Sequence, residues 1–239
     1  MRIRSGFRSG WILAMAVGWA SGLLAGASPA SADLMPVNGR DTTIGVTGID
    51  ELASLGIGFG FNTPTFYSTP DGTLRLVYPI TGGSFELETL FGTLVHKPDL
   101  GLTLSFGDAS VAFTDFVIDT MGSAFLLLAK ASITPVGGGQ PYMVPNLALF
   151  ELTFCDGPAF YPPCINNDGS NQIDGYGLLV TPEAAGEIGT AFGFDASSLV
   201  DTQFGIANIA ISFVPEPGTL ALAGLGLAGL AAIGRRRAA

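Results

Sequence analysis

Residues 92–129 read GTLVHKPDLGLTLSFGDASVAFTDFVIDTMGSAFLLLA, a series of apolar runs separated by turn residues. The four runs are Gly92–Lys97, Gly101–Phe106, Val111–Asp119 and Ala124–Ala129. Pro98-Asp99 separates the first two runs, and residues 120–123 separate the last two. Turn residues at intervals of about 8–12 positions are typical of antiparallel sandwiches and barrels. This stretch therefore predicts an all-β domain.

The same pattern extends on both sides of this stretch. Thr69-Pro70-Asp71-Gly72 predicts a hairpin turn, because proline presets φ and glycine allows positive φ. We expect Gly82-Gly83 to punctuate the strands and residues 33–43 to form a polar lead-in. Further strands are expected near Ile44–Thr47, Ile57–Phe61, Phe66-Tyr67, Leu74–Tyr78, Phe85–Thr89, Leu147–Phe154 and Phe204–Phe213. Together they predict a mostly antiparallel β-sandwich over residues 33–213, which is long enough for one core.

One short helix is expected within this sandwich, from Thr181 to about Phe192. Thr181 supplies an N-cap hydroxyl, and Pro182 suits the first helical position. Glu183 places an acid in the first turn, where the helix dipole favours negative charge. Gly193 is the expected stop, because glycine tolerates the left-handed conformation that ends many helices.

The N-terminus has the features of an export signal over residues 1–32. Three basic residues are followed by an apolar run over residues 11–27. The basic residues are Arg2, Arg4 and Arg8. Ala30 and Ala32 then form an A-x-A cleavage site, which predicts a signal peptide that is removed. The alternative is an N-terminal membrane anchor that is never cut.

The C-terminal residues 214–239, VPEPGTLALAGLGLAGLAAIGRRRAA, have three parts. The segment 214–218 is extended, because each proline fixes φ and disfavours helix before it. Residues 217–234 carry no charge, and their eighteen positions approach the roughly 17–25 that a membrane-spanning helix needs. The basic cluster Arg235, Arg236 and Arg237 follows, and it predicts a cytoplasmic C-terminus with the preceding domain outside. The alternative is a buried C-terminal helix of the domain itself.

This order of parts resembles the PEP-CTERM sorting signal of Gram-negative bacteria. The resemblance rests on Pro215, Glu216 and Pro217, on the apolar run 220–233, and on the arginine cluster. It implies recognition of the Pro-Glu-Pro segment by an exosortase, a membrane protease-transpeptidase, in a family associated with exopolysaccharide and biofilm export. The segment would then be a site that another enzyme acts on. Such a C-terminal domain is also labelled an ice-binding protein C-terminal domain, which implies nothing about ice binding here.

Removing both ends leaves a strongly acidic domain. Residues 33–213 hold four basic and nineteen acidic side chains, a formal net charge of −15. Such a domain is a poor ligand for nucleic acid, which requires cationic contacts. The charge suits either plain solvation of an exported surface or association with cations such as calcium.

Two cysteines and one histidine limit the possible chemistry. Cys155 and Cys164 are expected to form a disulfide, because the chain is exported. Closing this short loop would stabilise the fold by about 2–3 kcal/mol in the chain-entropy model. His96 alone excludes a multi-histidine zinc site. Beside Lys97 at a strand end, it is expected to be a solvated turn residue.

Acidic residues offer two further candidates. Glu86 and Glu88 are two positions apart, so in a strand they would share one face and could act as a carboxylate pair. The oxygen-rich segment 166–175 could bind calcium, with Asp168 and Asp174 as the ligands, although its spacing is not that of an EF-hand. Asn, Asp and Gly also form plain Asx turns. No cofactor fingerprint is present.

From these features we expect an exported, non-catalytic protein of the cell envelope or extracellular matrix. Its expected partners are an exosortase, the membrane through residues 217–234, and exopolysaccharide. Two alternatives stay open, a carbohydrate-active enzyme that uses Glu86 or Glu88 and a calcium-stabilised adhesion module.

Overall fold

The computed structural model describes residues 34–153, 165–166 and 171–214. The first half of the domain contains the strands and helix β1 (Met35–Val46), α1 (Ile49–Ser54), β2 (Gly58–Asn62), β3 (Thr65–Ser68), β4 (Leu74–Glu86), β5 (Phe91–His96), β6 (Gly101–Phe106) and β7 (Ala109–Asp119). The second half contains β8 (Leu126–Thr134), η1 (Val136–Gly138), β9 (Tyr142–Thr153), β10 (Ile165–Asn166), β11 (Gln172–Val180), α2 (Pro182–Phe192), η2 (Ser197–Leu199) and β12 (Gln203–Phe213).

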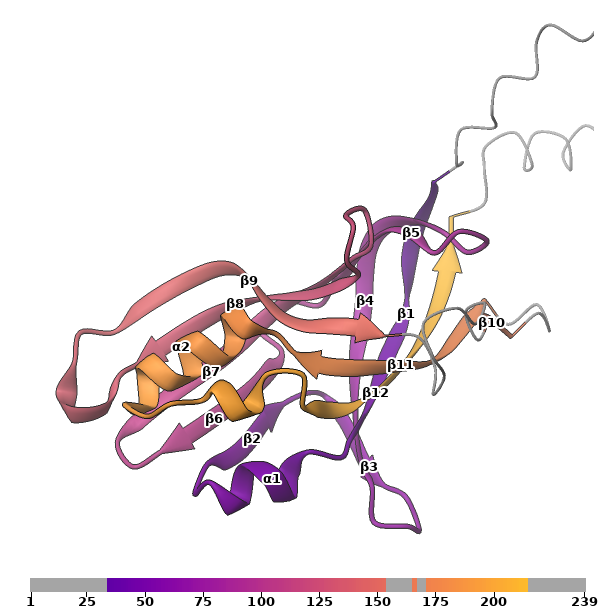
Figure 1. The fold of residues 1–239 in the computed structure, drawn as a ribbon. Helices are drawn as coiled ribbons and strands as arrows, with labels where there is room; N and C mark the ends of the chain where they lie inside the picture. The colour runs from indigo at the N-terminus through magenta and orange to yellow at the C-terminus, as the bar shows by residue number, and fades with distance from the viewer. Residues whose placement is uncertain (1–33, 154–164, 167–170, 215–239) are drawn as a thin grey trace, which may run out of the picture. The chain divides into compact units, whose positions relative to one another are not determined.

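All described strands belong to one antiparallel sheet, and this sheet closes on itself (Figure 1). The strand order β7-β5-β4-β1-β12-β11-β9-β8 returns to β7, because β7 and β8 also pair with each other. The result is a closed barrel of eight strands, so the predicted β-sandwich is wrong. The physical reason is that alternation and turn spacing show which face of a strand is buried, whereas closure depends on which distant strands pair.

Period-two burial explains why these residues form strands. In β8 the buried residues are Leu127, Ala129, Ala131 and Ile133, and the residues between them are partly exposed. The apolar side chains of strands and helices join into a single core cluster. The sheet closes, and the core cluster of the described residues lies between Val37 and Ile211, so we expect residues 33–214 to fold as a domain on their own.

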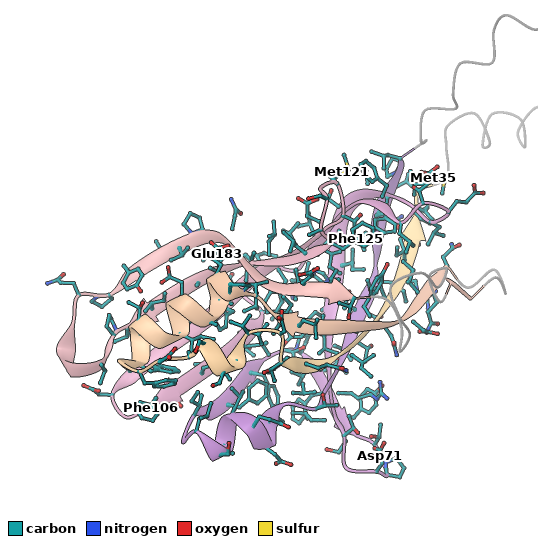
Figure 2. All side chains as sticks on the ribbon, viewed as in Figure 1. Met35, Asp71, Phe106, Met121, Phe125 and Glu183 are labelled. Atoms are coloured by element: carbon teal, nitrogen blue, oxygen red, sulfur yellow. The ribbon has the colours of Figure 1, made fainter. Side chains whose placement is uncertain are left out.

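The barrel has two distinct ends (Figure 2). At one end, which we call the tail end, Met35 pairs with Phe85 and Val37 pairs with Phe213. At the other end, which we call the pocket end, Val46 pairs with both Leu74 and Gly205. From Phe213 to Gly205, β12 covers about 26 Å at the usual strand rise.

At the pocket end the sheet branches on β7. The first part of β7 pairs with β6, and residues 117–119 pair with β5. Asp115 lies at the change of partner, at a register shift and with a φ of 57°. Its carboxylate accepts from Lys130 Nζ at 2.6 Å and from the Asp99 amide at 3.0 Å. These contacts stabilise the branch, which adds β6 and β2 to the barrel wall.

Two helices cover the pocket end (Figure 1). The predicted helix is confirmed as α2: the Ala184 amide donates to Thr181 Oγ1 at 3.1 Å, and Gly193 ends the helix with a φ of 73°. It buries Ala184, Ile188 and Phe192 against β7 and β9. The second helix, α1, was not expected from the sequence.

Several strand predictions need correction at their boundaries. Residues 35–43 are part of β1 rather than a polar lead-in. Gly82-Gly83 lies inside β4, which continues to Glu86. The predicted hairpin turn at residues 69–72 is confirmed between β3 and β4, where the Gly72 amide donates to the Thr69 carbonyl at 2.9 Å.

Candidate functional site

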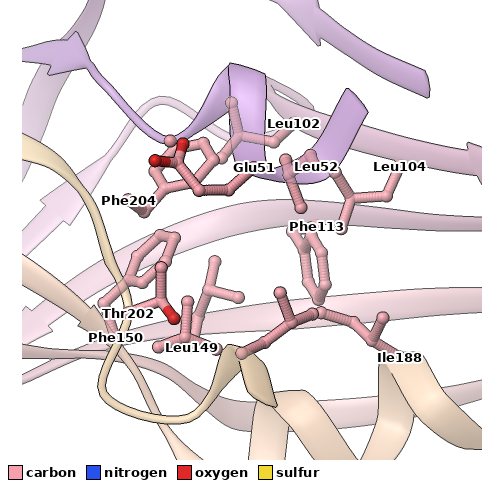
Figure 3. A pocket seen from close by; sticks show the side chains of 13 residues that line it. Glu51, Leu52, Leu102, Leu104, Phe113, Leu149, Phe150, Ile188, Thr202 and Phe204 are labelled. Carbon is pink, nitrogen blue, oxygen red and sulfur yellow. The ribbon is translucent and has the colours of Figure 1, made fainter. Parts of the chain in front are cut away.

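A small apolar pocket lies between α1 and α2 at the pocket end (Figure 3). Its lining comes from α1, β6, β7, β9, β11, α2, η2 and β12, so the pocket exists only when distant parts of the chain meet. The cavity volume is about 40 Å³. The lining residues are Gly48, Glu51, Leu52, Leu102, Leu104, Phe113, Leu149, Phe150, Val180, Ile188, Leu199, Thr202 and Phe204.

The lining is almost entirely carbon. Glu51 is the single ionisable residue of the pocket, and its side chain is exposed to solvent. Figure 3 shows its carboxylate beside Phe204. Thr202 is the other polar side chain, and its hydroxyl already donates to the Ser198 carbonyl at 3.2 Å. The pocket can therefore hold an apolar group, with one carboxylate available outside it.

The position of Glu51 follows from how α1 is attached. The Thr47 and Gly48 amides both donate to the Phe204 carbonyl, at 2.9 and 3.0 Å, which fixes the start of α1 against β12. Leu52 is the one buried residue of the helix and faces the core.

Sequence reasoning missed this site. The acids after Gly48 and the apolar pair Ile49 and Leu52, three positions apart, are the signal that could have indicated a short helix here.

An aromatic row leads from the surface to this pocket. Phe66 of β3 is 59% exposed, and its ring lies edge-on to Phe61 at 5.0 Å. Phe61 contacts Phe59 at 6.2 Å, and Phe59 contacts Phe204 at 5.7 Å. Phe204 stacks on Phe150 at 5.0 Å, and both of these rings line the pocket. The row links the exposed edge strand β3 to the apolar interior.

His96 is buried inside the barrel, with 3% of its surface exposed, so its prediction as a solvated turn residue is wrong. Its ring nitrogens contact the Phe116 carbonyl at 3.0 Å and Thr42 Oγ1 at 2.8 Å. A carbonyl can only accept, so Nδ1 carries the proton and Thr42 donates to Nε2. The imidazole is therefore neutral, and burial lowers its pKa from 6.5 to about 4. The prediction failed because β5 ends at His96 with its side chain facing inward.

Glu86 and Glu88 do not share a strand face. β4 ends at Glu86, and Glu88 is an exposed residue of the turn that follows. Glu86 accepts a hydrogen bond from the Thr89 hydroxyl. Neither carboxylate lines the pocket between α1 and α2.

The other candidates of the sequence fall partly outside the described residues. Asp174 lies in β11 and accepts from Gln172 Nε2 at 2.7 Å, whereas Asp168 lies outside the described residues. In the described part of the chain, no group of three or more metal-ligating side chains comes together. The disulfide of Cys155 and Cys164 also lies outside the described residues and stays a prediction.

The chain leaves the barrel directly from the sheet. β12 ends at Phe213, and the Val214 amide donates to the Pro36 carbonyl at 2.9 Å. Pro215 follows one residue later, so no spacer separates the barrel from the Pro-Glu-Pro segment. The segment itself, the helix predicted over 217–234, the arginine cluster and the cleavage site of the signal peptide lie outside the described residues. Among the residues described, no helix is long and apolar enough to cross a membrane.

Comparison with solved structures shows the fold. The crystal structure of the C-terminal domain of HtaA from Corynebacterium glutamicum is similar, with a TM-score of 0.50 and 10% identity, over 74% of this chain and 99% of that one. The N-terminal domain of the same protein gives a TM-score of 0.46 and 12% identity, over 73% and 99%. Curated proteins include no match to this chain.

The family comparison concerns the C-terminus. Residues 213–237 match the PEP-CTERM protein-sorting motif, which confirms the resemblance carried by residues 215–217 and the segments after them. Nothing in this match concerns ice binding. The motif indicates an exported protein that an exosortase recognises and sorts to the cell envelope. The chain therefore carries a PEP-CTERM sorting motif, which follows directly on a closed β-barrel domain.

Proposed function

We propose that the protein is a non-catalytic component of the cell envelope or extracellular matrix, and that its barrel contacts exopolysaccharide. The observation that carries the proposal is the junction at Val214, where the sorting motif begins at the tail end of the barrel. The pocket end is the end of the described barrel that lies away from this junction. We propose that this end contacts the surroundings of the cell.

Exposed aromatic side chains support contact with sugar at that end. Phe66 and Tyr67 of β3 are 59% and 47% exposed. β3 pairs with residues 74–77 of β4, so both rings lie at the pocket end. The apolar faces of sugar rings stack on aromatic rings, and large exposed aromatic side chains commonly form contact surfaces.

The arrangement of acids supports a non-catalytic role. Hydrolysis of a glycoside needs two carboxylates that face one substrate. In the described pocket between α1 and α2, Glu51 is the one carboxylate, and Glu86 and Glu88 lie elsewhere.

The sorting part is tested by intact mass and fractionation of the native protein from cells with and without exosortase. We expect a chain lacking the residues beyond the Pro-Glu-Pro segment, found outside the inner membrane only when exosortase is present. Retention of Arg235–Arg237 in the membrane fraction of both strains would make the tail a plain anchor and remove the support for the matrix role.

The binding part is tested by cosedimentation of the folded domain with exopolysaccharide from the same cells. Replacing Phe66 and Tyr67 together by serine should weaken binding at least about tenfold and lower the melting temperature only slightly, because both side chains are exposed and Phe66 loses one ring contact, with Phe61. Met143→Ser is the matched control, since Met143 is a 68% exposed apolar residue on β9. Equal binding by all variants, or no binding by the unaltered domain, would refute the sugar contact.

A further inference from the structure

We propose that the pocket between α1 and α2 binds the aliphatic end of a small cationic amphiphile, of the alkylamine class, with its head beside Glu51. This site is independent of the proposed contact with exopolysaccharide, which uses the exposed edge strand. The inference rests on the size of the cavity, on its carbon lining, and on the charge at its opening.

The size of the cavity limits the ligand. A volume of about 40 Å³ is several times what one water molecule needs, yet it is far smaller than the pockets that enclose drug-sized ligands. A chain end of a few methylene groups fits this space, whereas a ring system does not. Filling an apolar cavity of this kind with water is unfavourable, because a buried water molecule needs two to four polar partners.

The lining selects an aliphatic group. Leu104, Leu149 and Ile188 face the cavity from β6, β9 and α2, and all three are at most 5% exposed. The Thr202 hydroxyl is occupied by Ser198. A ligand with polar atoms at its buried end would therefore leave them without partners, which opposes binding.

The charge at the opening of the pocket favours a ligand with a cationic head group. Glu51 forms no ion pair within the described residues, and its neighbour Asp50 is exposed as well. The four basic residues between positions 33 and 213 are Arg40, Arg75, Lys97 and Lys130, and none of them lines the pocket. A cation near this opening meets an unpaired carboxylate in a domain whose net charge is strongly negative, whereas an anion is repelled.

The site lies at the end of the described barrel that is away from the sorting motif. Gly48, Thr202 and Phe204 belong to the pocket end, opposite the junction at Val214. The hydrogen bonds from Thr47 and Gly48 to Phe204 keep the rim in place, so Glu51 keeps its position beside the opening.

The test compares three ligands with the same chain, octylammonium, octanol and octanoate, titrated calorimetrically into residues 33–214 at pH 7. We expect octylammonium to bind best and octanoate worst, with at least a tenfold difference in Kd between them. Shortening the ammonium ligand by one methylene group should weaken binding about fourfold while that group still reaches the cavity.

Variants of Glu51 distinguish the contribution of the ligand's head group from that of its alkyl chain. Glu51→Gln should lower the affinity for octylammonium to that for octanol, and Glu51→Lys should reverse the order of octylammonium and octanoate. Asp50→Asn is the matched control, because Asp50 is an exposed acid of the same helix that does not line the pocket. Equal effects of Asp50→Asn and Glu51→Gln would overturn the assigned position of the head.

Methyl NMR of the unaltered domain locates the alkyl chain of the ligand without any substitution in the core. Octylammonium should shift the methyl resonances of Leu104, Leu149 and Ile188 and leave those of Leu94 in place, since Leu94 is buried but does not line the pocket. Shifts confined to exposed residues, or no binding by any of the three ligands, would refute the site.

Discussion

His96 shows how burial sets the chemistry of a single side chain. Its ring lies inside the barrel, where it donates to the Phe116 carbonyl and accepts from Thr42. Protonating it would place a charge in the core and remove the acceptor that Thr42 uses. Among the described residues it is therefore a titratable group with a structural role rather than a candidate base at the pocket, which it does not line.

Replacing His96 by Asn should reduce the pH dependence of stability. The pKa of an unfolded histidine is about 6.5 and that of folded His96 is about 4, so between these values the unfolded state binds more protons. The contribution of His96 to the free energy of unfolding should therefore be fully present above about pH 6.5. It should fall by about 2 kcal/mol between pH 7 and pH 4.5.

Urea unfolding of the unaltered domain and of His96→Asn at both pH values measures this contribution. The variant should lose about 1–3 kcal/mol at pH 7, because Thr42 is left without its acceptor, but should lose about 2 kcal/mol less than the unaltered domain on acidification. Because the carboxylates are common to both proteins, the difference isolates His96. An equal loss in both proteins would contradict the assignment.

At the scale of elements, the contacts of a glycine indicate its structural role better than its position in the sequence does. The sequence predicted that Gly82-Gly83 would separate two strands, but β4 continues through both. A register shift against β5 lies between Ile80 and Gly82, and Gly83 has a φ of 125°. The absence of a side chain lets β4 bend while the Thr93 carbonyl of β5 approaches closely.

Gly83→Ala should therefore destabilise the domain much more than Gly82→Ala. A Cβ at position 83 would lie 2.1 Å from the Thr93 carbonyl oxygen and would also need the strained positive φ. We expect a loss of about 2–4 kcal/mol in urea unfolding. At position 82 nothing lies within 4 Å of the added atom, so this neighbour is the control. Similar losses at both positions would show that the bend does not require Gly83.

The sequence predicted an element well where the signals for that element lie close together in the chain. The N-cap, proline and stop glycine of α2 lie within thirteen residues, and the hairpin turn at Thr69–Gly72 needs only four. The pocket could not be predicted in this way. Glu51, Phe113 and Phe204 meet there from three distant segments, and each looks like an ordinary surface or core residue in its own segment.

At the scale of the whole molecule, closure is what distinguishes this domain from the predicted sandwich. β1 pairs with β12, so strands from the two ends of the domain lie side by side. The pattern of apolar runs predicted that β7, β8 and β12 would be strands, because it depends on local burial. It could not predict the pairings of β1 with β12 and β7 with β8 as parts of one closed sheet, because such pairings leave no local pattern.

A domain that ends at Ala210 should melt about 10 °C below one that ends at Val214. The shorter chain lacks Ile211, which is buried, the pairing of residues 211–213 with β1, and the hydrogen bonds from Ile211 to Asn171 and from Val214 to Pro36. Losing this burial and these bonds costs about 4 kcal/mol. Circular dichroism melts of the two chains measure the difference. Equal melting temperatures would mean that closure at the tail end contributes nothing to stability.

The pairing of β12 on both of its sides also determines how the domain would carry a mechanical load. β12 is paired with β1 on one side and with β11 on the other. A pull on Val214 that is resisted at the pocket end acts along β12, so both ladders are sheared and many hydrogen bonds must break together. A pull on Val214 against the start of β1 would instead peel the same pairs apart one after another. The domain should therefore resist force best when it is held by its tail and loaded at its far end.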